Sequence, residues 1–121
     1  MGAVGGRFSV DEYLRGACGS MASCEMVEAH AAIWADMQSG AVQCARERLV
    51  QLLPLLNMGS VFRQSAVKRI LLKRGLIQSD HFRDANPPLD SQDAAEIDWI
   101  YASLEHLMTA TVRPPKEVHA L

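Results

Sequence analysis

This sequence has no long hydrophobic run and no excess of positive charge, although about half of its residues are apolar. No apolar stretch approaches the ~20 residues that a membrane-spanning helix needs. Residues 1–10 also lack the long apolar core of a secretory signal. The formal net charge of −2 disfavours nucleic-acid binding, because domains with that role usually carry a basic excess. We therefore expect a soluble protein that acts without a membrane or a nucleic acid.

Cysteines are also scarce, and their number is odd, since Cys18, Cys24 and Cys44 are the full set. Without a secretory signal, this count favours free thiols in a reducing cytosol, so we expect a cytoplasmic protein. A zinc site from Cys18, Cys24 and His30 is conceivable, but a role as small buried hydrophobes suits these cysteines better. A nucleophilic Cys24 has no histidine partner identifiable from the sequence, and no H-x-x-x-H pattern occurs. We predict neither a metal nor a cofactor.

Helical periodicity dominates the remaining pattern, and 121 residues suffice for one domain with a core. The segments predicted as helices are residues 9–15, 23–38, about 41–56, 61–74 and a last one that begins at Asp90 or Ser91. Residues 3–6 are interpreted as a strand end or a loop, and residues 17–22 as a short buried strand. The expected fold class is therefore mainly α.

Local signals mark the start of the first predicted helix. Ser9 and Glu12 have the S-x-x-E spacing of a capping box, in which the serine side chain accepts a hydrogen bond from a backbone amide. Phe8 and Tyr13 are spaced as a hydrophobic staple around that box. The sequence thus predicts a helix that begins at Ser9 through its own side-chain chemistry.

Other helix boundaries are predicted in the same way. Ser23 is a candidate N-cap for the second helix, and Glu25 lies in the first turn, where the helix dipole favours a negative charge. Pro54 is expected to kink the last turn of the third helix. A break at residues 57–60 is then expected to separate the third helix from the fourth.

Several short motifs follow one another along the chain. They are RGACGSM at 15–21, LLPLLNM at 52–58, VKRILLKRGLI at 67–77 and PLD at 88–90. Each is unspecific alone, but in this order, across residues 4–108, the chain resembles the C-terminal third of the dihydrodipicolinate synthase / N-acetylneuraminate lyase family. Members of that family are (β/α)8 barrels with three extra C-terminal helices. The resemblance implies strands seven and eight and helices seven and eight of a barrel, followed by the three-helix extension.

The same resemblance implies a division of the chain into three parts. Residues 1–40 would be the remnant of the barrel, and residues 41–110 would be the C-terminal helical extension. Residues 111–121, which include Pro114 and Pro115, are predicted to be a flexible tail.

The resemblance also implies that catalytic residues are missing. Family members form a Schiff base between a lysine on strand six and a 2-oxo acid such as pyruvate, with a tyrosine from strand five and a Thr/Ser pair after strand two. All of these positions would lie upstream of this chain. Its lysines are Lys68 and Lys73 on the fourth predicted helix and Lys116 in the tail, where a surface role is expected. The chain alone is therefore predicted to be an inactive piece of a lyase.

The family-implied substrate-binding positions are few. Gly5 and Gly6 would lie at the end of strand seven, and Gly19, Ser20 and Met21 at the end of strand eight. Both groups would then line the C-terminal face, where barrel enzymes hold their active sites. The glycines match neither a P-loop nor a dinucleotide-binding fingerprint, so close packing between strand and helix is the alternative.

A barrel with two of its eight strands cannot close, so open strand edges and exposed apolar surface are expected. Such surface favours self-association or a complementing chain. Three hypotheses stay open: a truncated and silent piece of a lyase, one half of a split lyase completed by a partner with strands one to six, or an unrelated small helical interaction module.

Overall fold

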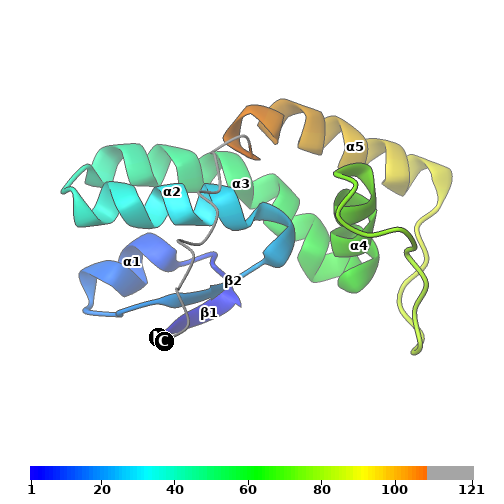
Figure 1. Ribbon diagram of the computed structural model, residues 1–121, viewed down its shortest axis with the longest axis horizontal. Helices are drawn as coiled ribbons and strands as arrows, with labels where there is room; N and C mark the ends of the chain where they lie inside the picture. Colours follow the sequence, from blue (N-terminus) through cyan, green and yellow to red (C-terminus); the bar gives the residue numbers. More distant parts are fainter. Residues whose placement is uncertain (109–121) are drawn as a thin grey trace, which may run out of the picture.

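The computed structural model describes residues 1–108 (Figure 1). In chain order, the elements are β1 (Gly2–Gly5), α1 (Ser9–Leu14), β2 (Ser20–Ala22), the 3-10 helix η1 (Cys24–Met26), α2 (Val27–Gln38), α3 (Val42–Phe62), α4 (Gln64–Lys73), α5 (Ser91–Leu104) and the 3-10 helix η2 (Glu105–Met108). The mainly helical class is thereby confirmed. The predicted tail at residues 111–121 lies outside the described residues. Across residues 1–108, no helix combines the length and apolar character that crossing a membrane requires.

The strands β1 and β2 pair in parallel and are connected through α1, which makes a strand–helix–strand unit. Gly2 pairs with Ser20 near the amino ends, and Gly5 pairs with Ala22 at the carboxyl ends. β1 therefore uses one more residue than β2 over the same span, and Val4 has a φ of 57° within this irregularity. A positive φ is strained for a β-branched residue. The two segments interpreted from the sequence as possible strands, residues 3–6 and 17–22, overlap β1 and β2. The predicted burial of the second is wrong, because β2 is half-exposed.

The helix α1 begins without the predicted capping box. Phe8 occupies the N-cap position, and its side chain makes no capping hydrogen bond. Ser9 lies inside the first turn, and its hydroxyl is buried. The predicted staple is also wrong, because Phe8 is exposed while the Tyr13 ring packs edge-on against Trp34, with 4.8 Å between the centroids. Packing against the neighbouring layer, and not the local end of the helix, decides where these side chains point.

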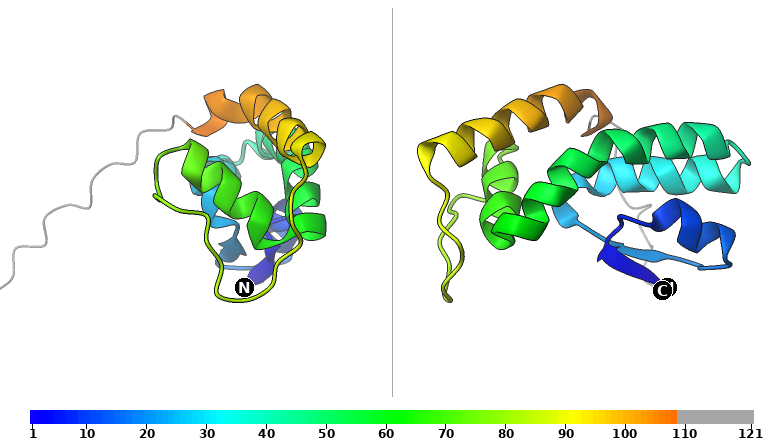
Figure 2. Two further views of the ribbon diagram at one scale, coloured as in Figure 1. Left: turned by 90° about the vertical axis from the view of Figure 1, so that its right-hand side faces the viewer. Right: turned by 180° about the vertical axis from the view of Figure 1, so that it is seen from behind.

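The helices α2 and α3 lie side by side in every view and form a helical hairpin (Figures 1 and 2). The second predicted helix is divided, since η1 precedes α2. Across the hairpin, Arg48 Nε of α3 donates to the Asp36 carboxylate of α2 at 2.7 Å. This layer separates the strands from α5, which lies on the opposite side of the molecule.

The predicted break at residues 57–60 is wrong, because α3 continues through Pro54 and through that segment. Pro54 lacks the N–H that would bond to the carbonyl of Val50, but Val50 is exposed, so water can satisfy that oxygen. Leu52 before the proline and Leu55 and Leu56 after it are buried in the core. Burial on both sides of the proline therefore keeps the helix continuous.

The chain turns sharply between α3 and α4 at Arg63, whose φ is 51°. With a ψ of −130°, Arg63 lies outside the helical region and interrupts the helical backbone at a single residue. As a result, α4 begins at Gln64, three residues after the predicted start at Val61.

The helix α5 begins where the sequence predicted. Asp90 Oδ1 accepts hydrogen bonds from the backbone N–H groups of Gln92 and Asp93 at 2.9 and 2.8 Å. The Asp93 carboxylate accepts one from the N–H of Asp90, which completes a capping box. Arg69 of α4 donates two hydrogen bonds, at 2.9 and 2.8 Å, to the Asp98 carboxylate and so fixes α5 against α4.

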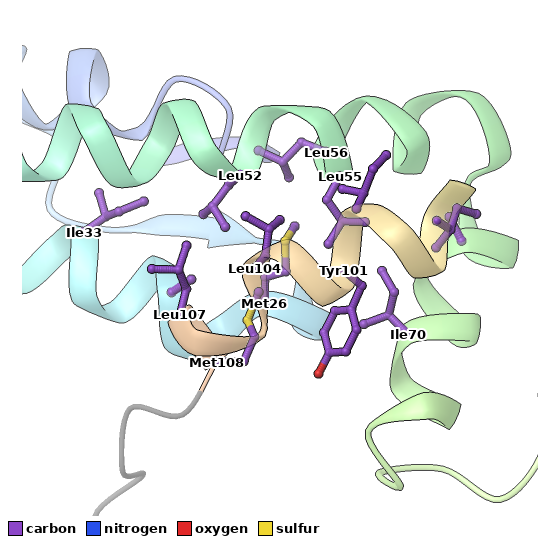
Figure 3. Packing of buried hydrophobic residues seen from close by; sticks show 14 of the residues in the cluster. Met26, Ile33, Leu52, Leu55, Leu56, Ile70, Tyr101, Leu104, Leu107 and Met108 are labelled. Carbon is purple, nitrogen blue, oxygen red and sulfur yellow. The ribbon is translucent and has the colours of Figure 1, made fainter. Parts of the chain in front are cut away.

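One apolar core joins the strand-bearing part to the later helices. Figure 3 shows Leu52, Leu55 and Leu56 of α3 facing Leu104 of α5 and Met26 of η1. The largest fully buried apolar side chains are Met26, Ile33, Leu52, Leu55, Ile70 and Ile97, which come from five different elements. Because both parts share this core, the position of the strands relative to α3, α4 and α5 is set by packing.

Candidate functional site

A pocket of about 590 Å³, here called the strand-end pocket, opens at the carboxyl ends of β1 and β2. On the strand side it is lined by Val4, Gly5, Arg7, Ser23 and Glu25. The opposite wall comes from the end of α3, the start of α4 and residues 84–86 of the connector before α5. Ligands of α/β folds with parallel strands bind at this edge. The strand-end pocket is therefore the candidate functional site.

Glu25 is a buried acidic residue of the strand-end pocket, with 1% of its surface exposed. Its Oε1 accepts a hydrogen bond from the Ser23 hydroxyl at 2.9 Å. Ser23 therefore makes no cap for the following helix, contrary to the sequence prediction. Glu25 Oε2 is buried without a hydrogen-bond partner among the protein atoms of residues 1–108. A buried carboxylate oxygen in this state is an acceptor for a hydroxyl or amino group of a ligand.

Arg7 supplies the donor of the same pocket. Its Nη2 donates to the carbonyl oxygen of Leu56 in α3 at 2.8 Å, while its Nε is buried and has no partner within the described part of the chain. Val4, Gly5 and Gly6, directly before it, all have positive φ values, of 57°, 66° and 86°. This unusual turn carries the chain from β1 toward α1 and brings Arg7 into the pocket wall. The pocket thus offers one unused donor and one unused acceptor to a polar ligand.

Arg74, at the end of α4, supports the loop that carries Glu25. Its Nη1 donates to the backbone carbonyl of Glu25 at 2.6 Å, and its Nη2 pairs with the Glu28 carboxylate. The side chains of Arg74 and Glu28 are each 11% exposed. Burial by itself raises the pKa of Glu28, but the hydrogen bond and the charge of Arg74 hold that pKa below its ordinary value of 4.5. Arg74 therefore ties α4 to the segment after β2.

Two of the predicted substrate-binding positions lie at the carboxyl end of β1. Gly5 lines the strand-end pocket. Gly6 is buried, and a Cβ placed on it would lie 2.5 Å from Cε1 of the His30 ring. Gly6 thus permits close packing between the chain after β1 and the helix α2, which was the alternative interpretation of this glycine.

The other three predicted positions are placed differently. Gly19 precedes β2 and accepts a hydrogen bond from the N–H of Gly2 at 2.7 Å, so it lies at the amino end of the pair. Ser20 pairs with Gly2 at that same end, and the side chain of Met21 is exposed. Their predicted placement at the carboxyl end of strand β2 is therefore wrong for Gly19 and Ser20, because β2 begins only at Ser20. The strand-end pocket instead uses residues after Ala22.

The lysines of α4 have partners elsewhere. Lys68 Nζ donates to the backbone carbonyl of His81 at 2.6 Å and lies 4.3 Å from the centroid of the Phe82 ring. Lys73 pairs with Asp98 at 3.4 Å. Neither side chain lines the strand-end pocket. Lys116 lies outside the described residues.

The three cysteines are free and exposed, so the expectation that Cys18 and Cys24 are small buried hydrophobes is wrong. They lie in the connector before β2, in η1 and in α3, and their Sγ atoms make no disulfide. Between residues 1 and 108, no three potential metal-ligating side chains come together. His30, the histidine of the alternative zinc site, is buried.

His30 lines a second pocket, of about 370 Å³, between β2, the start of α1 and α2. We call it the His30 pocket. Burial lowers the pKa of His30 below its ordinary value of 6.5. The unfolded chain therefore binds a proton at this residue at a higher pH than the folded chain does. Stability is complete above pH 6.5 and falls as the pH drops from there toward the lowered pKa.

We accordingly expect the free energy of unfolding to decrease between pH 7.5 and 5.5, by at most about 1.4 kcal/mol per pH unit from this residue. Urea unfolding followed by circular dichroism at several pH values measures the slope. His30→Gln removes the titrating group and should flatten it. An unchanged slope in His30→Gln would show that another group is responsible. Glu28 does not affect this slope, because its pKa lies below 4.5 and the measurement covers pH 5.5 to 7.5.

Sequence reasoning missed Arg7 and Glu25 as site residues. The available signals were the position of Arg7 directly after a Gly-Gly pair and that of Glu25 three residues after a strand. Comparisons with protein-family models, curated proteins and solved structures found no match to this chain. The site is therefore defined by its geometry.

Proposed function

We propose that this chain is the C-terminal segment of a (β/α)8 lyase of the dihydrodipicolinate synthase / N-acetylneuraminate lyase type, which acts on 2-oxo acids such as pyruvate. The observation that carries the proposal is the parallel β1–α1–β2 unit with a polar pocket at its carboxyl ends. In (β/α)8 barrels, each parallel strand is followed by a helix, and the active site lies at that end. In this arrangement, α2 corresponds to the eighth helix, and α3, α4 and α5 correspond to the three extra helices.

In such a barrel, the strand-end pocket forms part of the mouth of the active site. Arg7 Nε is a donor for a carboxylate or carbonyl oxygen of the substrate, and Glu25 Oε2 is an acceptor for a hydroxyl group. Both groups are buried and unused by the described protein atoms, so a polar substrate would satisfy them without displacing an existing bond. This chain would thereby bind and orient substrate, while the covalent chemistry belongs to residues outside it.

We further propose that the chain is catalytically silent alone. A Schiff-base lysine needs a lowered pKa, usually obtained by burial next to the substrate. Lys68 and Lys73 lie on α4 and have the partners described above. Incubation with pyruvate and borohydride should therefore leave the mass of the intact protein unchanged, while a family lyase in parallel gains a reduced adduct. A stoichiometric adduct on this chain alone would contradict the proposal.

One half of a split lyase is the second candidate, and the open strand edges favour it. Within residues 1–108, β1 and β2 pair only with each other, so one edge of each strand has no neighbouring strand. Large apolar side chains are exposed on the same part of the chain, namely Met1, Val4, Phe8, Leu14, Met21 and Val27. Such a surface suits a complementing chain or self-association. An unrelated helical interaction module would not need the parallel strand pair.

The two candidates differ in a mixing experiment. A separately produced polypeptide with strands one to six of a family lyase supplies the lysine, and this chain supplies the rest. A split enzyme predicts a complex and a borohydride-trapped pyruvate adduct only in the mixture. Arg7→Met should weaken pyruvate-dependent activity in the mixture, whereas Arg15→Met, at the exposed residue directly after α1, should not. If the two polypeptides form no complex, the split arrangement is contradicted.

A further inference from the structure

Three residues that line the His30 pocket have polar side-chain atoms without a hydrogen-bond partner among residues 1–108. They come from three elements that lie next to one another in Figure 1: Ser9 from α1, Ser20 from β2 and His30 from α2. Ser9 is 3% exposed and His30 is 8% exposed. The hydroxyl oxygens of both serines and both ring nitrogens of His30 are buried, and none has a partner within residues 1–108. Buried polar groups in proteins are normally paired, so this concentration in one pocket indicates a missing ligand.

The rest of the pocket wall is mainly apolar. Ala22, Val27, Ala31 and Trp34 contribute to it together with the polar Gln38, and no Asp, Glu, Lys or Arg side chain among residues 1–108 lines it. An ion in this pocket would meet no opposite charge from the wall, so a charged ligand gains little there. Trp34 offers an aromatic surface whose position is supported by the edge-on contact with Tyr13. These features resemble small-molecule sites, in which an apolar enclosure is combined with a few convergent polar groups.

The hydrogen-bonding capacity of the wall specifies the polar end of the ligand. Burial lowers the pKa of His30, so its imidazole is neutral near pH 7 and offers one donor and one acceptor. Each serine hydroxyl can donate and accept as well. A ligand hydroxyl, which also donates one hydrogen bond and accepts others, matches this set.

We propose that the His30 pocket binds a small uncharged molecule with an apolar body and a hydroxyl group, and that Ser9, Ser20 and His30 bind the hydroxyl. This site is distinct from the strand-end pocket, since the two share no lining residue. The proposal goes beyond the proposed lyase role and does not depend on it. Its test requires no lyase activity, so the failure of one proposal leaves the other standing.

Benzyl alcohol, toluene and benzoate provide the test, because they share one ring and differ in a hydroxymethyl, a methyl and a carboxylate group. Each is titrated into the full chain while amide and indole N–H signals are followed by NMR. Benzyl alcohol should shift the Trp34 indole signal and the amides of residues 20–22 saturably. Its dissociation constant should be about tenfold lower than that of either analogue. The exposed Trp99 serves as an internal reference that should not shift.

Variants then identify the groups that bind the hydroxyl. His30→Phe keeps a ring but removes both nitrogens, and it should weaken benzyl alcohol about tenfold while leaving toluene unchanged. Ser20→Ala removes one hydroxyl from a half-buried residue and should weaken benzyl alcohol several-fold, which keeps the test valid if His30→Phe does not fold. His81→Phe, in the exposed connector, is the matched control and should have no effect.

Three results would overturn the proposal. The first is the absence of saturable shifts with benzyl alcohol. The second is toluene binding as tightly as benzyl alcohol, because the polar groups would then contribute nothing. The third is a shift of the residue 20–22 amides with protein concentration alone, which would assign the pocket to a second copy of the chain.

Discussion

Replacing Arg74 with methionine is expected to lower the free energy of unfolding by about 3 kcal/mol, the low end of the cost of removing one partner of a buried ion pair, because both residues are only partly buried. The Glu28 carboxylate would stay buried without its guanidinium partner, and the Glu25 carbonyl would lose its 2.6 Å hydrogen bond. Since both side chains of the pair are 11% exposed, solvent screens their interaction little. Urea unfolding followed by circular dichroism measures the change.

Arg15→Met is the matched control for Arg74→Met. Arg15 pairs with Asp11 at 2.8 Å, but both side chains are exposed, so its loss should cost less than about 1 kcal/mol. Adding Glu28→Gln to Arg74→Met removes the stranded charge and should recover part of the stability. Equal costs for the two arginine variants would refute the role given to Arg74.

The Arg74–Glu28 pair also makes the free energy of unfolding depend on pH, and the direction of that dependence can be predicted. The pKa of Glu28 is lowered in the folded chain, so the unfolded chain takes up the proton first as the pH falls. The stability from the pair is therefore complete above the ordinary value of 4.5 and is lost below it. As the pH falls below 4.5, the stability of Arg74→Met should therefore decrease less than that of the parent chain.

Replacing Gly6 with alanine is expected to cost about 3 kcal/mol, because backbone strain and overpacking each contribute roughly 1–3 kcal/mol. The φ of Gly6 is 86°, which disfavours any residue with a Cβ. The new Cβ would also lie 2.5 Å from Cε1 and 2.8 Å from Nδ1 of His30. Thermal and urea unfolding would report the loss.

Gly16→Ala separates these two causes. Gly16 has a φ of 95°, but a Cβ there would meet nothing within 4 Å, so only the conformational cost of roughly 1–2 kcal/mol applies. The difference between the two alanine variants measures the contact with His30. Adding His30→Ala to Gly6→Ala should relieve that contact alone. If Gly6→Ala and Gly16→Ala cost the same, the chain after β1 does not pack closely on α2.

The helix boundaries show where local signals suffice. The helix α5 begins where the sequence predicts, and it is capped by the Asp90–Asp93 pair, whose partners lie within one turn of each other. Ser9 and Glu12 have an equivalent spacing, yet no cap forms. The Ser9 side chain lies in the wall of the His30 pocket, and that location is created by α2 and β2. A capping signal therefore fails when tertiary packing takes the same side chain elsewhere.

The candidate site was less predictable than the helices. The sequence drew attention to Gly5 and Gly6 at the end of a strand, and Gly5 does line the strand-end pocket. Arg7 and Glu25 carry no motif, and they become neighbours of one pocket only because β1 and β2 pair in parallel. The register of a pair this short is not encoded by alternation of apolar residues, so Gly19 and Ser20 were placed at the wrong end.

The sequence by itself determined the mainly helical class, the apolar faces of the helices and the start of α5, because these depend on residues within one or two turns of each other. The tertiary structure alone decided that α3 continues past Pro54, that Arg74 reaches the segment after β2 and that polar side chains from separate elements line the same pocket. Those outcomes depend on which distant elements share the core, and burial there outweighs the local preferences of about 1 kcal/mol that sequence patterns report.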